Sequence, residues 1–398
     1  MCVFKEETMT DAAESRSFPG KRKLDLRGLS PAMRLAELRR LGLIGPGRDD
    51  ALVRTPEGLV PSFDAMIENA IGAFPVPLGV ATNFMVNGVP RLVAMATEER
   101  SVIAAASKAA KLSAPSGGIS VTVGRPRTKA QILYARLDDP PEVLRKLRER
   151  RAVIEDLLAS ECNPMRKHGG GLTVEEPRFV PGDRDTLIIL EISVDTADAM
   201  GANVVTRIAE RAADRLLRLF TGTKPTAVIC CNDDAGFPAT AEAAFEVPGD
   251  ERLVRRLLDV HAWADHDPSR AVTHNKGVMN AVSAVALATG QDTRAIEACV
   301  HASAARGGLY RPLTSYVADG PNRVRGTLAL TLPIGTVGGA TSHPTAVFCR
   351  KLMGVAGAAD LAGLMAAAGL AQNFAALLAL AGEGIPGSHA RLSKQRHP

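Results

Sequence analysis

Four segments of the 398-residue chain carry side chains that could do acid–base or electrostatic chemistry. They are residues 68–77 with 98–101 downstream, residues 198–203, residues 270–280 with Asp292 downstream, and the Gly-rich residues 335–341 with His389 downstream. A lysine offers a fixed positive charge, and carboxylates and a histidine can exchange protons. These segments are therefore the candidates for a site that polarises a substrate and moves protons.

Each segment taken alone also has an ordinary structural explanation. Glu98 and Glu99 precede an Ala-rich stretch and would complement a helix dipole, and Asp198 would be a helix N-cap. Lys276 would be a solvated lysine, Gly338-Gly339 a turn, and His389 a solvent-exposed side chain. A functional interpretation therefore depends on the segments occurring together.

The composition indicates a globular protein of two or three domains, since domains average about 150 residues. The chain is 46% apolar and 23% charged, which excludes an intrinsically disordered protein. A net charge of only +5 and an aromatic content of 4% argue against a nucleic-acid partner.

The six cysteines include no C-x-x-C pair, so neither a zinc site nor a disulfide framework is predicted, and no metal is expected. Residues 1–25 are predicted to be a disordered tail without the apolar core of a signal peptide, and we expect a cytoplasmic protein. The charge-free run Leu361–Gly382 could span a bilayer by length. Its Ala- and Gly-rich composition, with Gln372 and Asn373 near the centre, favours a buried helix.

The sequence around these segments shows two patterns, one mostly helical and one of alternating strands and helices. Ser30-Pro31 should open a helix, and the flanking parts, residues 26–116 and 232–385, are predicted to form one large, mostly helical domain. Between them, we expect strands at 119–123 and 131–137, a helix at 141–158, strands at 172–180 and 186–194, a helix at 202–220 and a strand at 226–231. This order predicts an α+β fold in which a small α+β domain, residues 117–231, interrupts the large one. No G-x-G-x-x-G lies between a strand and a helix, so a ferredoxin-like rather than a Rossmann domain is expected.

Taken together, the four segments resemble the 3-hydroxy-3-methylglutaryl-CoA (HMG-CoA) reductases, most closely the bacterial class II branch. The resemblance rests on ENAIGAF (68–74), DAMGAN (198–203), RAVTHNKGVMN (270–280) and GTVGGAT (335–341). It implies an oxidoreductase of mevalonate and isoprenoid metabolism that reduces HMG-CoA to mevalonate and CoA with two nicotinamide hydrides, or runs the reverse oxidation. It also implies a homodimer, or a higher oligomer of dimers, with the site at the subunit interface and no membrane partner.

The resemblance assigns four catalytic residues. Lys276 would stabilise the thioester oxyanion, His389 would protonate the departing CoA thiolate, and Glu99 would protonate the aldehyde oxygen. Asp292 would hold the lysine and the glutamate in register. A helix N-terminus and a lysine both lower a carboxyl pKa, so Glu99 could act as an acid only if burial and the charge of Asp292 raise its pKa.

The resemblance also assigns ligand contacts. Arg270 would bind the free carboxylate of the substrate. The other substrate-binding positions are Glu68, Ser101, Asn280 and Asn373, although Ser101 and Asn373 could instead make local helix hydrogen bonds. The inserted domain would bind NADH or NADPH at a helix N-terminus, through Asp198, Met200, Gly201 and Asn203.

Two features depart from the family. Residues 161–167 lack the Asp that holds the ribose in NADH-using members. Arg166 and Lys167 suit a 2′-phosphate, which favours NADPH. The class II assignment, in contrast, favours NADH. Residues 386–398 form a short tail where class II members continue into a closing flap. A non-catalytic CoA- or nucleotide-binding homologue is therefore the alternative, but the four retained catalytic positions favour an active enzyme.

Overall fold

The computed structural model describes residues 29–40, 66–160, 171–182, 186–218 and 224–382, in two compact units, residues 1–76 and 77–398. In the first unit α1 spans Pro31–Arg40, and the Ser30 hydroxyl accepts a 3.4 Å hydrogen bond from the Met33 amide. The helix start predicted at Ser30-Pro31 is therefore confirmed. The predicted tails, residues 1–25 and 386–398, lie outside the described residues.

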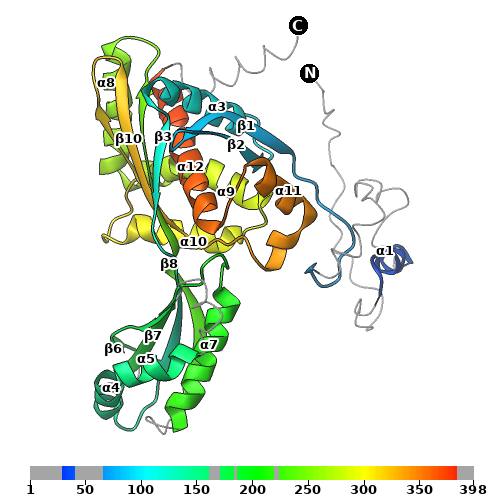
Figure 1. The fold of residues 1–398 in the computed structure, drawn as a ribbon, viewed down its shortest axis with the longest axis vertical. Coiled ribbons are helices and arrows are strands. Elements are labelled where there is room, and N and C mark those ends of the chain that lie inside the picture. The colour runs from blue at the N-terminus through cyan, green and yellow to red at the C-terminus, as the bar shows by residue number, and fades with distance from the viewer. Residues whose placement is uncertain (1–28, 41–65, 161–170, 183–185, 219–223, 383–398) are drawn as a thin grey trace, which may run out of the picture. The chain divides into compact units, whose positions relative to one another are not determined.

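Residues 77–126 and 232–382, here called the large lobe, contain a mixed sheet in addition to the expected helices (Figure 1). Its strands, in spatial order, are β2 (Val89–Ala96), β1 (Leu78–Val86), β3 (Ile119–Val123), the C-terminal part of β8 (Ala227–Glu246), β10 (Arg323–Leu332) and β9 (Thr314–Ala318). β1 and β3 are parallel, and the other neighbours are antiparallel. The helices are α3 (Val102–Ser113), α8 (Glu251–His266), α9 (Pro268–Ala288), α10 (Thr293–Ala305), α11 (Pro344–Leu352) and α12 (Ala358–Ala381).

α12 is the buried helix that the charge-free run predicted. Gly363 and Gly369 allow its close approach to neighbours, because a Cβ on either would lie 3.0 Å from Val121 or Val278 respectively. Among the described residues, α12 is the one helix long and apolar enough to cross a membrane, and 78% of its most apolar window is buried within the protein. It packs between the sheet, α3 and α9.

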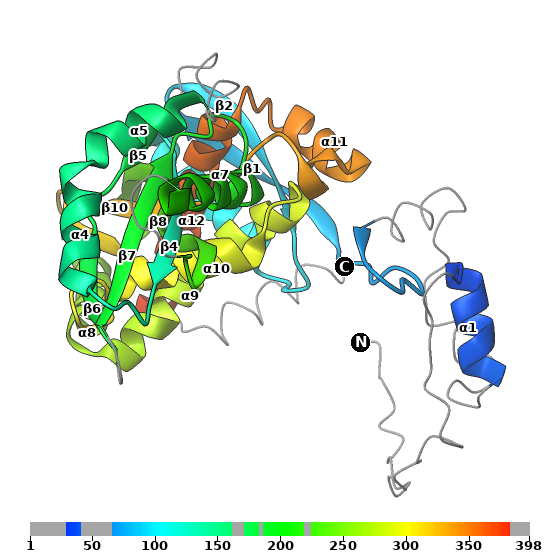
Figure 2. The same ribbon diagram turned by 90° about the horizontal axis from the view of Figure 1, so that it is seen from below.

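Residues 127–231, here called the small lobe, form an antiparallel sheet in the order β8-β4-β7-β5. Its elements are β4 (Arg127–Tyr134), α4 (Pro140–Glu149), α5 (Arg151–Ala159), β5 (Leu172–Val174), β6 (Arg178–Pro181), β7 (Thr186–Val194) and α7 (Ala202–Leu216). Alternate residues such as Ile132 and Leu190 are buried against α4, α5 and α7 (Figures 1 and 2). This core has no member in common with the core of the large lobe.

Several expected boundaries were wrong. The helix predicted at 141–158 is two helices, interrupted at Arg150, whose ψ of 10° is not helical. The strand at 119–123 has the predicted bounds, but Ile119 packs in the core of the large lobe. Beyond residue 232, where helix was expected, β8 continues to Glu246 and joins the two lobes (Figure 1). Its alanines suggested helix, but Phe237, Ala239, Ala241 and Ala243 are buried while Pro238, Thr240 and Glu242 are exposed, which is the period of a strand.

Candidate active site

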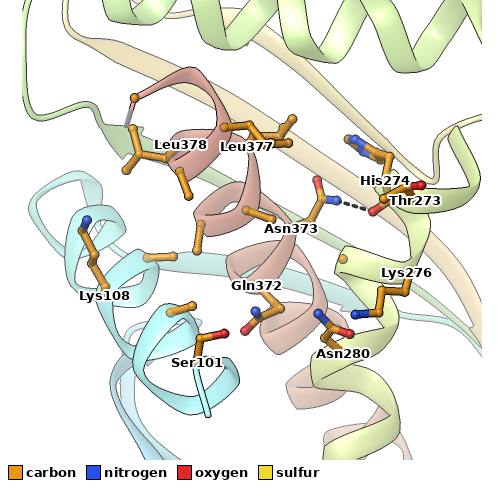
Figure 3. Close-up of a pocket in the computed structure, with 18 of the residues that line it drawn as sticks. Ser101, Lys108, Thr273, His274, Lys276, Asn280, Gln372, Asn373, Leu377 and Leu378 are labelled. Carbon is orange, nitrogen blue, oxygen red and sulfur yellow. Dashed lines mark hydrogen bonds between the residues drawn. The ribbon is translucent and has the colours of Figure 1, made fainter. Parts of the chain in front are cut away.

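A cavity of about 980 Å³ lies in the large lobe between α3, α8, α9 and α12. Six of the residues predicted for the site line it, namely Glu99, Ser101, Arg270, Lys276, Asn280 and Asn373. In Figure 3 the side chains of Ser101 from α3, of Lys276 and Asn280 from α9, and of Gln372 from α12 face one another across it. The structure thus gathers residues from segments almost 300 positions apart in the sequence.

α9 supplies the polar wall of the cavity because Arg270, Thr273, Gly277 and Asn280 recur every three or four residues. The helix starts at Pro268, after the N-cap Asp267, whose carboxylate accepts a 2.9 Å hydrogen bond from the Ser269 amide. Gly277 brings α12 close, since a Cβ there would lie 3.3 Å from Asn373 Nδ2.

Arg270 is held as a buried cation. Arg270 is only 9% exposed, and its guanidinium carbon lies 5.5 Å from the centre of the Trp263 ring. Burial lowers the pKa of Arg270, and its Nε has no hydrogen-bond partner in the described chain. Within the same residues no carboxylate forms an ion pair with it, so Arg270 is available to bind an anion that enters the cavity.

Most hydrogen-bonding groups of the Asn373 side chain are bonded to the protein itself. Its Oδ1 accepts hydrogen bonds from the Thr314 hydroxyl at 3.1 Å and the Tyr316 hydroxyl at 2.9 Å, and its Nδ2 donates to the His274 carbonyl at 2.8 Å. An asparagine amide can make about four such bonds, so one N–H is left for a ligand. Asn373 therefore ties α9, α12 and β9 together, and its contact with substrate stays a prediction.

His274 is a buried residue of α9 that lines the cavity. Burial, with smaller contributions from His261 and Arg270, lowers the pKa of His274 to about 3. Its Nε2 lies 2.5 Å from the Thr314 hydroxyl, and the ring centres of His261 and His274 are 5.8 Å apart. Burial also lowers the pKa of His261.

Gln372 was not among the predicted site residues. It is 4% exposed, and its Oε1 is buried with no hydrogen-bond partner in the described chain. Buried polar atoms are normally bonded, and Gln372 lines the cavity, so this oxygen is a candidate for contact with a ligand. A glutamine in the middle of a charge-free buried helix was the sequence signal that could have identified it.

Glu99 and Lys276 line the cavity, and both are exposed. The Ser101 hydroxyl donates to Glu99 Oε1 at 3.5 Å, and the Glu99 amide donates to the Thr97 hydroxyl at 3.1 Å. Glu99 is therefore not buried within the single chain. Ser101 is the N-cap residue of α3, but its side chain makes no capping hydrogen bond there, and its role stays a prediction.

Asp292 does not join Lys276 in one chain. Its Oδ1 accepts hydrogen bonds from the Arg294 amide at 3.1 Å and the Ala295 amide at 3.2 Å, which makes it the N-cap of α10. The preceding residue, Gln291, is bonded to the Ala286 carbonyl at 2.9 Å. Ala286 lies ten residues beyond Lys276 on α9, which is about 15 Å along the helix. Within one chain Asp292 is therefore the N-cap of α10, and its role in ordering Lys276 stays a prediction.

The residues predicted to bind the dinucleotide lie at the junction of the two lobes. Gly201, with φ of +83°, is the N-cap of α7, and no side chain caps this helix. Thr128 donates a 3.3 Å hydrogen bond to the Met200 carbonyl, and Asn203 is exposed in the first turn. Asp198 is bonded to the large lobe, as described below. The amides at the start of α7 are thus open to an anionic group.

Three predicted features fall elsewhere. Glu68 is exposed in the unit of residues 1–76, and its role stays a prediction. His389, and Arg166 and Lys167, lie outside the described residues. In the part of the chain that the structure describes, no three His, Cys, Asp or Glu side chains group as metal ligands.

Comparison with known proteins gives one consistent family. The sequence profile of the hydroxymethylglutaryl-coenzyme A reductases matches residues 50–394. The chain is 43% identical over 334 residues to the 3-hydroxy-3-methylglutaryl-coenzyme A reductase of Archaeoglobus fulgidus, which spans 83% of this chain and 76% of the relative. It is 35% identical over 337 residues to the probable reductase of Borreliella burgdorferi, with coverages of 82% and 76%.

Comparison with solved structures points to the same family. The class II 3-hydroxy-3-methylglutaryl-CoA reductase of Streptococcus pneumoniae, bound to NADPH in open conformations, superposes with a TM-score of 0.74 at 31% identity. The match covers 90% of this chain and 100% of that one. The mixed α/β architecture of the two proteins is the same.

Proposed function

Because the chain belongs to the hydroxymethylglutaryl-coenzyme A reductase family, we propose that the cavity between α3, α9 and α12 is where its thioester substrate is reduced. The chain is an oxidoreductase of the mevalonate pathway that converts HMG-CoA to mevalonate and CoA with NADH or NADPH. Nothing in the comparisons supports the non-catalytic alternative. The assignment of individual residues is our proposal.

The observation that carries the proposal is that one cavity holds both Arg270 and Lys276. HMG-CoA has a free carboxylate at one end of a short chain and the thioester carbonyl at the other. Arg270 would bind the carboxylate, since a buried guanidinium without an ion-pair partner suits a two-point contact. Lys276 would then lie by the thioester carbonyl and stabilise the negative charge that forms on its oxygen.

The remaining polar side chains complete the substrate site. Asn280 and Ser101 would hydrogen-bond the substrate between its two ends, with the last N–H of Asn373 as a further contact, and the substrate contact of Glu68 stays a prediction. Glu99 would protonate the aldehyde oxygen in the second reduction, and His389 would protonate the CoA thiolate after the first. Apolar residues such as Leu112, Leu253 and Leu378 form the other side of the cavity, which suits an alkyl part of the substrate.

The small lobe would hold the dinucleotide, which supplies both hydrides. Support comes from the uncapped N-terminus of α7, with Gly201 at the N-cap, and from the amides of Met200 and Asn203 beside it. We propose a division into a cofactor domain, residues 117–231, and a catalytic domain, residues 26–116 and 232–385. Within the cofactor domain, the hydrophobic core of the small lobe starts at β4. We describe this lobe as ferredoxin-like because its strand order is β8-β4-β7-β5 with two helical crossovers.

The enzyme would work as a homodimer or a larger assembly of dimers. In one chain Asp292 and the dinucleotide segment lie at the C-terminal end of α9, whereas Arg270 lies in its first turn and Lys276 near its middle. A second copy could supply Asp292 to the cavity and bury the exposed Glu99, which would raise the carboxyl pKa as an acid requires. The cytoplasmic location, and the absence of nucleic-acid and membrane partners, stay predictions.

The test is the fall in absorbance at 340 nm when HMG-CoA is added to the enzyme with NADH, and separately with NADPH. We expect oxidation of at least one dinucleotide, with mevalonate and free thiol as products. Supplying mevaldehyde tests the second half-reaction alone, in which no thiolate leaves. Should neither substrate consume either dinucleotide, the proposed site would be refuted. A His389→Gln variant that loses only HMG-CoA reduction would support the role of His389.

A further inference from the structure

The start of α12 is capped by a residue from the other lobe. Gly357, at the N-cap position, has no side chain to offer, and no side-chain cap forms within the helix. Instead, Asp198 Oδ1 accepts a 2.7 Å hydrogen bond from the amide of Ala358, the first residue of α12. A carboxylate at a helix N-terminus satisfies an amide without an intrahelical partner and complements the helix dipole.

Two further contacts hold the same loop on the large lobe. The Thr336 amide donates to the Asp198 carbonyl at 2.8 Å, and Ala199 forms a parallel bridge with Val337. The absence of a side chain at Gly335 allows this close approach, because a Cβ there would lie 2.2 Å from the Met200 amide nitrogen. Gln291 in turn holds Gly335, whose amide donates to the Gln291 Oε1 at 2.9 Å. Backbone and side chain of Asp198 thus bind two separate segments of the large lobe.

The loop that carries Asp198 is internally stiff. The Thr196 hydroxyl donates to the Ala199 carbonyl at 2.7 Å and lies 3.2 Å from the Thr128 hydroxyl. Gly201 closes the loop at φ of +83°, and a Cβ on it would lie 2.4 Å from Thr196. A shift of Asp198 is therefore passed to Gly201, which begins α7.

We propose that Asp198 is a positioning residue: by capping α12 it fixes the N-terminus of α7, and with it the dinucleotide, against the large lobe. This replaces the direct cofactor contact that the resemblance assigned to Asp198, and it rests on the proposed function only for the identity of the ligand at α7. Met200, Gly201 and Asn203 remain the residues that would meet the dinucleotide. Asp198 acts on binding by keeping the loop in the competent position.

Two substitutions remove the cap from opposite sides. Asp198→Ala deletes the acceptor. Gly357→Ala places a Cβ 2.9 Å from Asp198 Oδ1 and should push the carboxylate away from Ala358. The φ of Gly357 is −174°, which any residue adopts, so the backbone is not strained. Asp198→Asn keeps an oxygen acceptor. Gly307→Ala is the control, because a Cβ there meets nothing within 4 Å.

Three measurements separate the possibilities: the Kd for NADPH by fluorescence, the KM for each substrate, and hydrogen exchange of the Ala358 amide. A side-chain cap changes an equilibrium about fivefold. We expect D198A and G357A each to weaken NADPH binding by about that factor, with the KM for HMG-CoA little changed and Ala358 exchanging faster. D198N and G307A should resemble wild type, and the double variant D198A/G357A should be no worse than D198A.

Other outcomes would overturn the inference. If D198N were as impaired as D198A while G357A bound NADPH normally, the carboxylate would contact the dinucleotide itself. Unchanged exchange at Ala358 in D198A would show that the cap does not form, whatever the enzyme binds. A wild-type protein that binds neither dinucleotide would instead refute the proposed function, because the exchange measurement does not depend on cofactor.

Discussion

α9 and α12 pack antiparallel, since His274 meets Asn373 while Val278 and Val282 meet Gly369. The two ends of this pair use polar groups in different ways. At the cavity end, Arg270 Nε and Gln372 Oε1 are buried without partners in the described chain. At the junction end, the side chains of Asp198 and Gln291 are bonded to backbone amides of the large lobe.

This difference separates the two tasks of the pair. A buried polar atom without a partner costs free energy, so Arg270 Nε and Gln372 Oε1, which belong to residues that line the cavity, are candidates for contact with a ligand. The junction end is complete by itself and fixes the small lobe on the large one. The cavity end is incomplete and is ready for a substrate with an anionic group and hydrogen-bonding oxygens.

The largest expected effect is at the cavity end. Lys276→Ala should lower kcat by about 10²–10³-fold without changing the fold, because it removes the cation beside the developing oxyanion. The measurement is steady-state turnover of HMG-CoA, with circular dichroism to check the fold. Lys108→Ala, which removes the other lysine of the cavity, is the control and should keep most of the activity. Turnover of K276A within about threefold of wild type would show that Lys276 is an ordinary solvated lysine.

Arg270→Lys should raise the KM for HMG-CoA by about 10–100-fold, because an ammonium cannot make the two parallel contacts of a guanidinium with a carboxylate. The effect on kcat should be smaller, since the carboxylate does not change in the reaction. Arg252→Lys on α8, where the side chain is 89% exposed, is the matched control and should leave the KM unchanged. An unchanged KM in R270K would place the carboxylate elsewhere.

The cavity wall should also make stability depend on pH. The folded pKa of His274, about 3, lies below the ordinary imidazole value of 6.5, so as the pH falls the unfolded chain binds a proton that the folded chain does not bind. Stability is therefore lost as the pH falls below 6.5, and at pH 5 the loss from this residue is about 2 kcal/mol. Burial also lowers the pKa of His261, which faces Asp265 and His274. His261 therefore adds to the loss of stability at low pH.

His274→Gln should remove this loss. Urea unfolding at pH 7.5 and pH 5 would measure it, with the exposed His266→Gln on α8 as control. The wild type and H266Q should lose stability to the same extent on acidification, and H274Q should lose less. Equal losses in all three proteins would mean that the imidazole of His274 is not buried in its neutral form.

The cavity end was largely predictable from the sequence, because its functional groups are side chains at helical spacing within short motifs. Arg270, Lys276 and Asn280 lie on consecutive turns of one helix, so recognising the motif was enough to bring them together. Gln372 lies next to a predicted residue and was missed because a glutamine in a buried helix has no motif of its own. The role of Asp292 stays a prediction, because in one chain this residue caps α10 and lies beyond the C-terminal end of α9.

The junction end could not be predicted in the same way. Its contacts join residues 198, 336 and 358 through backbone amides, and backbone groups leave no trace in residue types. The direct cofactor contact predicted for Asp198 stays a prediction, and its alternative role as the N-cap of the helix that follows it was wrong, because Asp198 bonds the amide of Ala358, 160 residues away. The continuation of β8 into the large lobe was missed because its alanines favour helix, and only burial against α12 and the sheet determines that they form a strand.

Two glutamines test the comparison with the smallest effect. Gln291 at the junction accepts from the Gly335 amide, whereas Gln372 Oε1 at the cavity has no partner in the described chain. Gln291→Met leaves the buried Gly335 amide unbonded and should lower the free energy of unfolding by about 1–3 kcal/mol. Gln372→Met leaves no protein group unbonded, so the free energy of unfolding should stay the same or rise by up to about 1 kcal/mol, while the KM for HMG-CoA rises about fivefold. Denaturant unfolding and steady-state kinetics on both variants measure the two effects. If Q372M were destabilised as much as Q291M, the cavity end would be as complete as the junction, and the division of tasks between the two ends would fail.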